Sequence, residues 1–395
     1  MAGHSADTHT AAPARADFIG LSRPDIGDEE IEEILQTLRS GWLTSGPRVR
    51  MFQQDLADYL DAAHVRCLSS CTAGLMLALR LAGVGPGDEV ILPAITFVAC
   101  ANVVEHAGAR PVFVDVDPAT GLIDLDAADA AVGPRTKAIM PVHLGGRPVD
   151  LDRVDALSRR HDLVVIEDAA HAIGAEWRGR RIGSHGHLCS FSFHATKNMT
   201  TFEGGALVVG DAEQAARVER LAMHGLSRTA WSRHASASAD RYEVVEPGFK
   251  LALNDVGAAA GIHQLRRLDG WIERRASLAA AYDELLAELP LDLPPDPTPG
   301  MRHAHHLYMV GVRDDAARSR EEIVQGLQER QVGSSVHFRG LHLFEYYRER
   351  YQVAPESLPA ANEWSGRALT LPLHPALSDD DVAYVADALG ELLRS

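Results

Sequence analysis

Lysine is scarce in this sequence, and so are positive charge and long apolar runs. The sequence has 38 basic residues and 55 acidic ones. Only three of the basic residues are lysines, namely Lys137, Lys197 and Lys250. The formal net charge of −17 argues against a nucleic-acid or anionic-membrane partner. No apolar run is long enough to span a bilayer, and the N-terminal segment lacks the apolar centre of a signal peptide. We therefore expect a soluble, cytoplasmic protein with a disordered leader over residues 1–18.

Cysteine is also rare, and its pattern does not favour metal binding. The four cysteines are Cys67, Cys71, Cys100 and Cys189. None belongs to a CxxC pair, and all four lie in apolar or strand-like surroundings, which favours buried reduced thiols. A histidine-rich stretch at residues 303–306 has no carboxylate or cysteine support at metal-ligand spacing. We expect no bound metal.

The scarcity of lysine draws attention to the stretch 188–205, LCSFSFHATKNMTTFEGG, in which Lys197 follows a strand-like run. Arginine stays protonated, whereas a desolvated lysine can lose its proton and attack a carbonyl. We interpret Lys197 as the residue that forms an imine with pyridoxal phosphate (PLP). Taken alone, Lys197 is equally compatible with a solvated loop lysine.

Short β-branched runs alternate with Ala/Leu-rich segments from residue 65 onward, which predicts an α/β fold. The expected strands lie in VRCLS, EVILP, PVFVDV, KAIMPVH, DLVVIED, LCSFSFH and ALVVGD. Nearly continuous apolar strands separated by helices are typical of a mostly parallel sheet sandwiched by helices. A long helix is expected around residues 255–291, before the break PLDLPPDPTPG. We expect a large domain over residues 19–255, and a linker helix with a small C-terminal α/β domain over residues 256–395.

Ligands of open α/β sheets bind beyond the carboxyl ends of the strands, and candidate phosphate-binding residues lie there. Thr72 and Ala73 follow the strand VRCLS at the start of a helix, where backbone N–H groups and the helix dipole suit a phosphate. Ser192, five residues before Lys197, can bind the same phosphate. A plain helix N-cap is the alternative for the first pair.

Two further strand ends carry side chains suited to an aromatic heterocycle. Phe97 follows EVILP and can stack on a flat ring or belong to the core. Asp168 ends DLVVIED, close to Glu167 and His171. A carboxylate there can keep a pyridine nitrogen protonated, or it can be a paired structural acid. A phosphate site, a stacking aromatic, a ring-nitrogen partner and an imine lysine together fit PLP.

Competing cofactor motifs fit less well. GVGPG at residues 83–87 precedes a strand, whereas a dinucleotide loop must precede a helix. The sequence contains no GxxxxGK[ST] and no GxSxG motif.

These residues lie in blocks that resemble the DegT/StrS family of sugar aminotransferases, which are PLP-dependent transferases of fold type I (aspartate aminotransferase-like). The resemblance covers residues 20–393, and its most specific blocks are SSCTAGLMLAL, PVFVDVDP, VIEDAAHAIGA and FSFHATKNMTTFEGGALV. It implies a homodimer whose active sites take residues from both subunits. The implied cofactor contacts are Lys197 as the attachment point, Asp168 at the ring nitrogen, Phe97 on the ring face, Thr72, Ala73 and Ser192 at the phosphate, and His171 beside the ring hydroxyl.

The sequence departs from the family in the block GFKLALND. Close relatives often have asparagine where this chain has Ala252, and that asparagine reaches the phosphate of the neighbouring subunit. Lys250 or Asn254 is expected to replace it.

The segment VHFRGLHLFEYYRERY resembles enzymes that aminate C4 of a nucleotide-linked 4-keto sugar, in particular the UDP-4-keto-pentose (4-amino-4-deoxyarabinose) branch. The resemblance places His337, Arg339 and His342 near the sugar nucleotide. It also makes Arg228, in the HGLSR segment, a candidate for binding a substrate phosphate or the donor carboxylate. Structural roles for these four residues remain open.

The resemblance implies transfer of the amino group of L-glutamate, which leaves as 2-oxoglutarate, to the 4-keto carbon of a TDP- or UDP-linked deoxy-sugar or pentose. A 3-keto-sugar or cyclitol aminotransferase would share every cofactor residue. A non-catalytic PLP-binding regulator is a third hypothesis, against which the lack of a DNA-binding appendage counts. The Arg- and Ala-rich composition would fit an antibiotic-sugar pathway.

Overall fold

The computed structural model describes residues 17–227 and 242–394, and its centre is a seven-stranded sheet. Across the sheet the strand order is β1-β9-β8-β5-β4-β2-β3. All neighbouring pairs from β8 to β3 are parallel, and only β9 runs against the others. The strand bounds are β1 Val65–Leu68, β2 Glu89–Pro93, β3 Arg110–Val114, β4 Thr136–Ile139, β5 Val164–Asp168, β8 Leu188–Ser192 and β9 Gly205–Val208. The predicted mostly parallel α/β sheet is confirmed.

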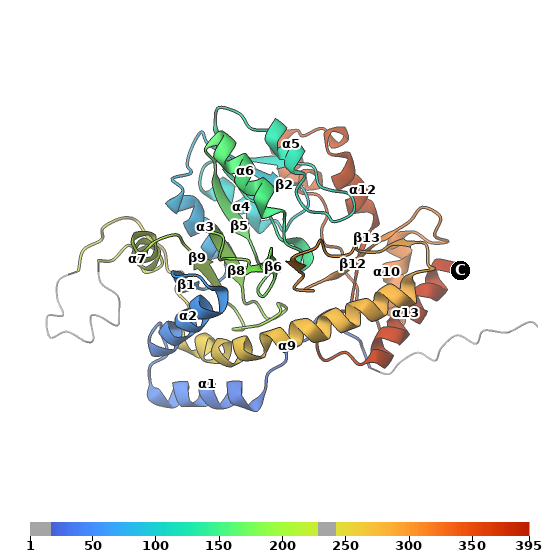
Figure 1. Ribbon diagram of the computed structural model, residues 1–395, viewed down its shortest axis with the longest axis horizontal. Helices are drawn as coiled ribbons and strands as arrows, with labels where there is room; N and C mark the ends of the chain where they lie inside the picture. Colours follow the sequence, from blue (N-terminus) through green and yellow to red (C-terminus); the bar gives the residue numbers. More distant parts are fainter. Residues whose placement is uncertain (1–16, 228–241, 395) are drawn as a thin grey trace, which may run out of the picture.

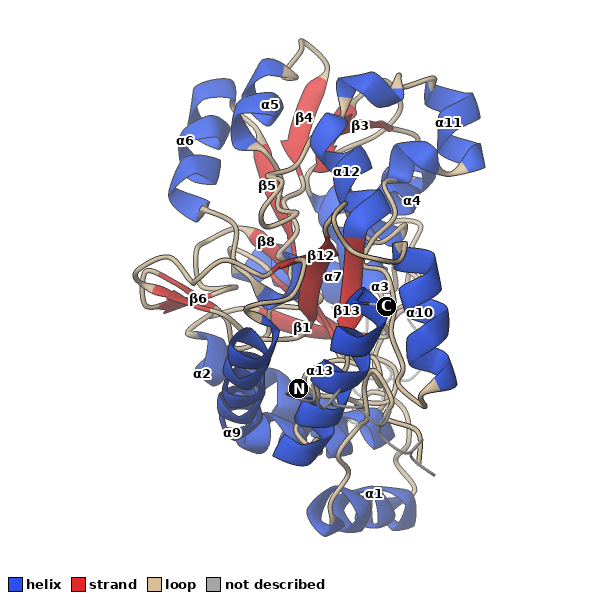
Figure 2. Ribbon diagram, turned by 90° about the vertical axis from the view of Figure 1, so that its right-hand side faces the viewer, coloured by secondary structure: helices blue, strands red, loops and turns tan. Residues whose placement is uncertain are grey.

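Helices cover both faces of this sheet. Figure 2 shows α5 and α6 on one side and α3 and α4 on the other. Aspartate side chains cap three of the surrounding helices, at Asp124, Asp150 and Asp211, by accepting backbone N–H bonds. The helix bounds are α3 Cys71–Leu81, α4 Ala99–His106, α5 Leu125–Ala130, α6 Leu151–His161 and α7 Ala212–Leu221. The central strands are consequently buried on both faces, which explains why apolar residues predominate in them, with Glu167 and Asp168 at the end of β5 as charged exceptions.

A single long helix, α9 (Asp255–Leu286), connects the two parts of the molecule (Figure 1). Its first half packs against α1 (Asp28–Ser40) and α2 (Pro47–Leu60), and its second half packs against α13 (Asp379–Arg394). The predicted long helix is therefore present, and it ends shortly before Pro290.

The C-terminal part is built on a small antiparallel sheet in the order β10-β12-β13. A third, three-stranded sheet, β11-β6-β7, lies at the edge of the large part. The bounds of these strands and of the remaining helices are β6 Glu176–Trp177, β7 Arg180–Arg181, β10 Leu291–Asp292, β11 Met301–Arg302, β12 Tyr308–Val312, β13 Ala368–Leu371, α10 Arg320–Glu329, α11 Glu345–Tyr351 and α12 Pro359–Arg367. None of the helices in the described ranges has the length and apolar composition of a membrane span.

Buried apolar side chains form two clusters, one around each sheet. Along α9, Ile272 belongs to the cluster of the large sheet and Leu278 to that of the small one. Ile19 also belongs to the second cluster, and it pairs with Val332. Ile19, the first residue of the expected large domain, thus packs with the C-terminal part. The division into two domains at residue 255 stays a prediction.

The start of α3 lies directly against β9, and the contact depends on Gly205. A Cβ atom at Gly205 would lie 2.4 Å from the carbonyl carbon of Ser70 and 2.5 Å from the backbone nitrogen of Cys71. Since both are backbone atoms that cannot rotate away, this position accepts only glycine without movement of the helix. Gly205 therefore sets where the N-terminus of α3 lies relative to the carboxyl end of β8.

We expect Gly205→Ala to lower the free energy of unfolding by about 1–3 kcal/mol because it overpacks this contact. The matched control is Gly270→Ala on the exposed side of α9, where an added Cβ meets no atom within 4 Å. Alanine there should stabilise the protein by about 0.5–1 kcal/mol through its higher helix propensity. Urea unfolding of the two variants measures both effects, and equal changes would contradict the close approach.

Candidate active site

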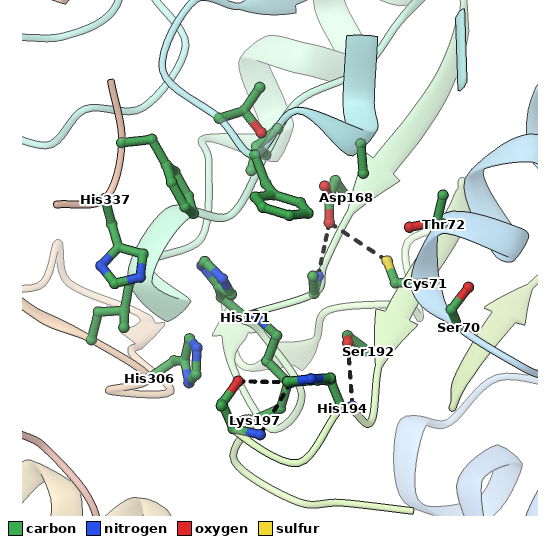
Figure 3. Close-up of a pocket in the computed structure, with 18 of the residues that line it drawn as sticks. Ser70, Cys71, Thr72, Asp168, His171, Ser192, His194, Lys197, His306 and His337 are labelled. Carbon is green, nitrogen blue, oxygen red and sulfur yellow. Dashed lines mark hydrogen bonds between the residues drawn. The ribbon is translucent and has the colours of Figure 1, made fainter. Parts of the chain in front are cut away.

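A cavity of about 400 Å³ lies at the carboxyl ends of β1, β2, β5 and β8 (Figure 3). It has the size of sites that hold small cofactors and metabolites. Seven of the predicted site residues line it: Thr72, Phe97, Asp168, His171, Ser192, Lys197 and His337. The lining residues come from segments as distant in the sequence as Thr72 and His337. The site therefore forms only when the four strand ends and the C-terminal part have come together.

Lys197 lies on the turn after β8, where its backbone N–H donates to the carbonyl of His194 at 3.0 Å. Burial lowers the pKa of its ammonium group to about 8, although the nearby Asp168 carboxylate acts in the opposite direction. A substantial share of the amine is therefore neutral near pH 8. A cavity-lining amine of this kind fits the proposed attack on a carbonyl and not the solvated loop lysine.

We expect the rate at which Lys197 captures an aldehyde such as PLP to rise with pH and to reach half its maximum near pH 8. The reason is that only the neutral amine is nucleophilic, and burial places its pKa there. Stopped-flow absorbance of cofactor-free protein mixed with the aldehyde measures this rate. Asp168→Asn should move the midpoint to lower pH because the carboxylate raises the pKa of the lysine. A midpoint at the ordinary lysine pKa would contradict the burial argument.

Asp168 and Glu167 are adjacent in β5 but point to opposite faces of the sheet, as neighbours in a strand do. Asp168 lines the cavity with 5% of its surface exposed, and its Oδ1 accepts the N–H of Ala170 at 3.0 Å. Glu167 is fully buried, 2.7 Å from Nε2 of His143 and 2.9 Å from Nδ1 of His187. Burial would raise the pKa of Glu167, but hydrogen bonds with the two histidines outweigh it and hold that pKa well below its usual range. Glu167 is therefore a structural acid, and Asp168 is the one available to a ligand.

Three imidazoles form one wall of the cavity, and their surroundings keep them neutral. Nδ1 of His171 accepts the N–H of Gly145 at 3.2 Å, so Nε2 carries its proton. The His306 ring lies 4.4 Å from that of His171, and the Nδ1 atom of His337 is 2.8 Å from the hydroxyl of Thr370. Burial lowers the pKa of all three, that of His337 to about 4, and nearby Lys197 acts in the same direction. This wall can exchange hydrogen bonds with hydroxyl groups without carrying charge.

The N-terminus of α3 borders the cavity, but its cap differs from the predicted one. Ser70 is the N-cap, and its hydroxyl accepts the N–H of Ala73 at 3.0 Å. Ala73 is buried and does not line the cavity, and its N–H is already used. Thr72 and Ser192 do line it, which leaves their hydroxyl groups near the positive end of the helix. A phosphate contact through the N–H of Ala73 would require the Ser70 cap to open.

Phe97 is exposed into the cavity and is not a core residue. It retains 56% of its surface, and its ring lies 5.9 Å from that of Phe338. Large aromatic side chains are seldom left so exposed without a partner, and here the open face borders a cavity. The position suits stacking on a flat ligand.

Besides Ala73, four predicted residues do not reach the cavity formed by this chain. Asn254 caps α9 by accepting the N–H of Gly257 at 2.8 Å, and Lys250 is exposed with Nζ 3.3 Å from the sulfur of Met223. Arg339 donates to the carbonyl of Leu343 at 2.8 Å, and buried His342 lies 2.8 Å from Oδ1 of Asn362. Ala252, the departure from the family pattern, forms an isolated bridge with Leu68. Arg228 lies outside the described residues.

The sequence interpretation missed several residues that line or support the cavity. His306 belongs to the histidine-rich stretch at residues 303–306, and in the structure its ring faces that of His171. Its Nδ1 lies 3.1 Å from Oδ1 of Asn198, which orients the ring. Among the described residues no group of three or more His, Cys, Asp or Glu side chains is arranged to hold a metal. Cys71 lines the cavity and Cys100 lies behind Asp168, at 2.9 Å from its Oδ2. The only sequence signal that either cysteine lies near the cavity is that Cys71 directly precedes Thr72.

Comparisons with known proteins agree with this geometry. Residues 24–390 match the sequence profile of the DegT/DnrJ/EryC1/StrS aminotransferase family. The chain is 43% identical over 382 residues to the spore coat polysaccharide biosynthesis protein SpsC of Bacillus subtilis (strain 168), covering 96% of this chain and 98% of that protein.

Solved structures give the same result. Spr1654 from Streptococcus pneumoniae, solved in a PMP form and a PLP form, is 33% identical with TM-scores of 0.90 and 0.89, and the match covers 95% of this chain and 98% of Spr1654. The aminotransferase TlmJ from Streptoalloteichus hindustanus is 37% identical with a TM-score of 0.87, again over 95% of this chain and 98% of TlmJ.

Proposed function

The chain belongs to the DegT/DnrJ/EryC1/StrS aminotransferase family, whose members depend on PLP, and we propose that it moves the amino group of L-glutamate to the 4-keto carbon of a nucleotide-linked sugar. The observation that carries the proposal is that one cavity contains both a lysine whose pKa is lowered to about 8 and the carboxylate of Asp168. The 4-keto specificity and the TDP or UDP carrier rest on the segment VHFRGLHLFEYYRERY, and the product would serve aminosugar biosynthesis.

The cavity fits PLP in size and in the chemistry of its walls. Asp168 would hold the ring nitrogen, Phe97 would cover the ring face, and the hydroxyls of Thr72 and Ser192 would take the phosphate at the start of α3. His171 would donate its Nε2 proton to the ring hydroxyl, because its Nδ1 already accepts from Gly145. PLP, when bound, supplies an electron sink that lets a proton leave the α-carbon of an amino acid.

The residues of the chain then have two tasks, to move protons and to fix charge. Lys197 Nζ would take the proton from the α-carbon of the donor and later deliver a proton to the sugar carbon that receives the amine. Burial assists this because an ordinary lysine would be almost fully protonated at neutral pH. Asp168 would hold a proton on the ring nitrogen throughout, and its fixed negative charge needs no rearrangement during the reaction.

The acceptor would lie against the imidazole wall. Nδ1 of His337 is hydrogen-bonded to the hydroxyl of Thr370, so Nε2 would be available to a sugar hydroxyl. His306 is held in the same way through Nδ1 by Asn198. Neutral imidazoles and the ring of Phe338 suit a sugar, which presents hydroxyl groups and apolar C–H faces.

We also propose that two copies of the chain share each site. Among the described residues no arginine lines the cavity, although the donor carries carboxylates that a guanidinium binds well. Asn254 lines a separate hollow together with the exposed side chains of Leu43 and Phe202. A second copy seated there would bring Asn254 or Lys250 to the neighbouring cavity, and Arg228 stays a prediction for the carboxylate or phosphate.

A substrate panel tests the proposed reaction. Purified enzyme with PLP and glutamate would be offered UDP-4-keto-pentose, TDP-4-keto-6-deoxyhexose, a nucleotide-linked 3-keto isomer and a keto-cyclitol. We expect 2-oxoglutarate and an aminated product from a 4-keto substrate. Amination of only the 3-keto sugar or the cyclitol would replace the proposal with that alternative. Cofactor binding without any consumption of glutamate would favour a regulator.

A further inference from the structure

Two cysteine side chains that are not among the predicted site residues lie against the carboxylate of Asp168. Cys100, on α4, is fully buried, and its sulfur lies 2.9 Å from Oδ2. Cys71, at the start of α3, lies 3.7 Å from Oδ1, a contact drawn in Figure 3. The hydroxyl oxygen of Thr96 is 3.1 Å from the sulfur of Cys100. Three elements of the chain thus meet at one buried carboxylate.

The direction of the hydrogen bonds follows from how many protons are available. An ionised carboxylate only accepts, so the S–H of Cys100 donates to Asp168. Because that thiol has a single proton, the O–H of Thr96 must donate to the sulfur. Cys71 contributes less, since its sulfur is nearer the carbonyl of Ser190, at 3.4 Å, than Asp168.

Two observations support a protonated Cys100 with a fixed geometry. Burial and the Asp168 carboxylate hold the pKa of this thiol well above its usual value, so the S–H persists at neutral pH. Cys100 lies behind the carboxylate and does not line the cavity, whereas Asp168 and Thr96 do. The thiol therefore holds Oδ2 from the protein side and leaves the cavity side of the carboxylate open.

We propose that Cys100, supported by Thr96, is a positioning residue that orients Asp168 toward the ring nitrogen of PLP. This inference rests on the proposed role of Asp168. The S–H group is a weak donor, so it restricts rotation of the carboxylate while withdrawing little of its negative charge. An O–H or N–H donor at the same place would form a stronger bond with the carboxylate and make it less basic toward the ring nitrogen.

The hydrogen bond itself is tested in cofactor-free protein by infrared spectroscopy of the S–H stretch. Cys100→Ser identifies the band of Cys100 by its loss, and Cys67→Ser identifies that of a buried thiol on β1 as a control. We expect the Cys100 band at the lower frequency, and we expect Asp168→Asn to raise it without moving the Cys67 band. The inference would be overturned if the Cys100 band had the same frequency as the Cys67 band and if Asp168→Asn left that frequency unchanged.

The effect on the cofactor is tested by titrating the absorbance of bound PLP and by steady-state kinetics. We expect Cys100→Ala to lower the pH at which the ring nitrogen loses its proton and to reduce kcat about tenfold with little change in KM. Cys100→Ser keeps a donor that orients the carboxylate, so it should recover most of kcat. Because its O–H makes the carboxylate less basic than the S–H does, it should restore only part of the ring-nitrogen titration. Cys67→Ala should change neither kcat nor the titration.

Unchanged titration and kcat in Cys100→Ala would contradict the positioning role. If Asp168→Asn leaves the ring-nitrogen titration unchanged, the proposed role of Asp168 fails instead. The infrared result on the cofactor-free protein separates these two failures, because it does not depend on how the cofactor binds.

Discussion

Lys197→Ala is expected to lower kcat by at least about 10²–10⁴-fold, because the variant lacks the group that we propose moves the proton. Among the described residues that line the cavity there is no second lysine, and the neighbouring imidazoles have pKa values lowered by burial, which makes them weak bases. Single-turnover formation of 2-oxoglutarate from the PLP-loaded variant measures the loss. Circular dichroism and the unfolding midpoint should stay close to those of the unchanged protein, since the lysine side chain supports no described hydrogen bond of the fold.

Two lysine variants serve as controls. Lys137→Ala removes an exposed lysine whose Nζ lies 2.9 Å from the carbonyl of Gly83, and it should leave kcat unchanged. Lys197→Arg keeps the charge but cannot lose its proton, so it should be as inactive as Lys197→Ala. Substantial turnover by Lys197→Arg would show that the charge matters and the proton transfer does not, which contradicts the proposal.

Asp168→Asn should lower kcat by about 10²–10³-fold while preserving the shape of the site. The amide has the size of the carboxylate, and its oxygen can still accept the N–H of Ala170 or the S–H of Cys100. It has no negative charge to keep a proton on the ring nitrogen, so the developing charge in the reaction is less stabilised. Kinetics with saturating glutamate and an absorbance titration of the bound cofactor check both parts.

Glu167→Gln is the matched control, since it removes the neighbouring carboxylate on the other face of the sheet. Glu167 is held by His143 and His187, so its variant should lower the unfolding midpoint and leave kcat nearly unchanged. A loss of turnover equal to that of Asp168→Asn would mean that removing either carboxylate of β5 impairs the enzyme, whichever face of the sheet it lies on. The specific role of Asp168 would then be wrong.

The sequence was most informative where strand ends and local chemistry coincide. The apolar runs predicted the mostly parallel sheet. The predicted positions of Phe97 beyond β2, Asp168 at the end of β5 and Lys197 beyond β8 bring these three residues to one cavity. This works because parallel strands carry their C-terminal residues to the same edge. The family and its PLP dependence, predicted from the sequence blocks, are confirmed by the comparisons.

The contributions of distant segments were harder to predict. His306 and Phe338 enter the cavity from loops of the C-terminal part, and no periodic pattern signals which side of an irregular loop faces a site. For the same reason His337 reaches the cavity while Arg339, two residues later, does not. The contact of Cys100 with Asp168 could not be predicted, because a buried thiol has the same sequence signature whether or not it donates a hydrogen bond.

The central claim, that the cofactor is attached to Lys197, is tested most directly by borohydride reduction of the PLP-loaded enzyme followed by peptide mass spectrometry. The chain has only three lysines, so the result has few alternatives. We predict a reduced pyridoxyl group on the peptide that contains Lys197, and its loss when glutamate is added before the borohydride. Modification at Lys137 or Lys250, or none at all, would contradict the account.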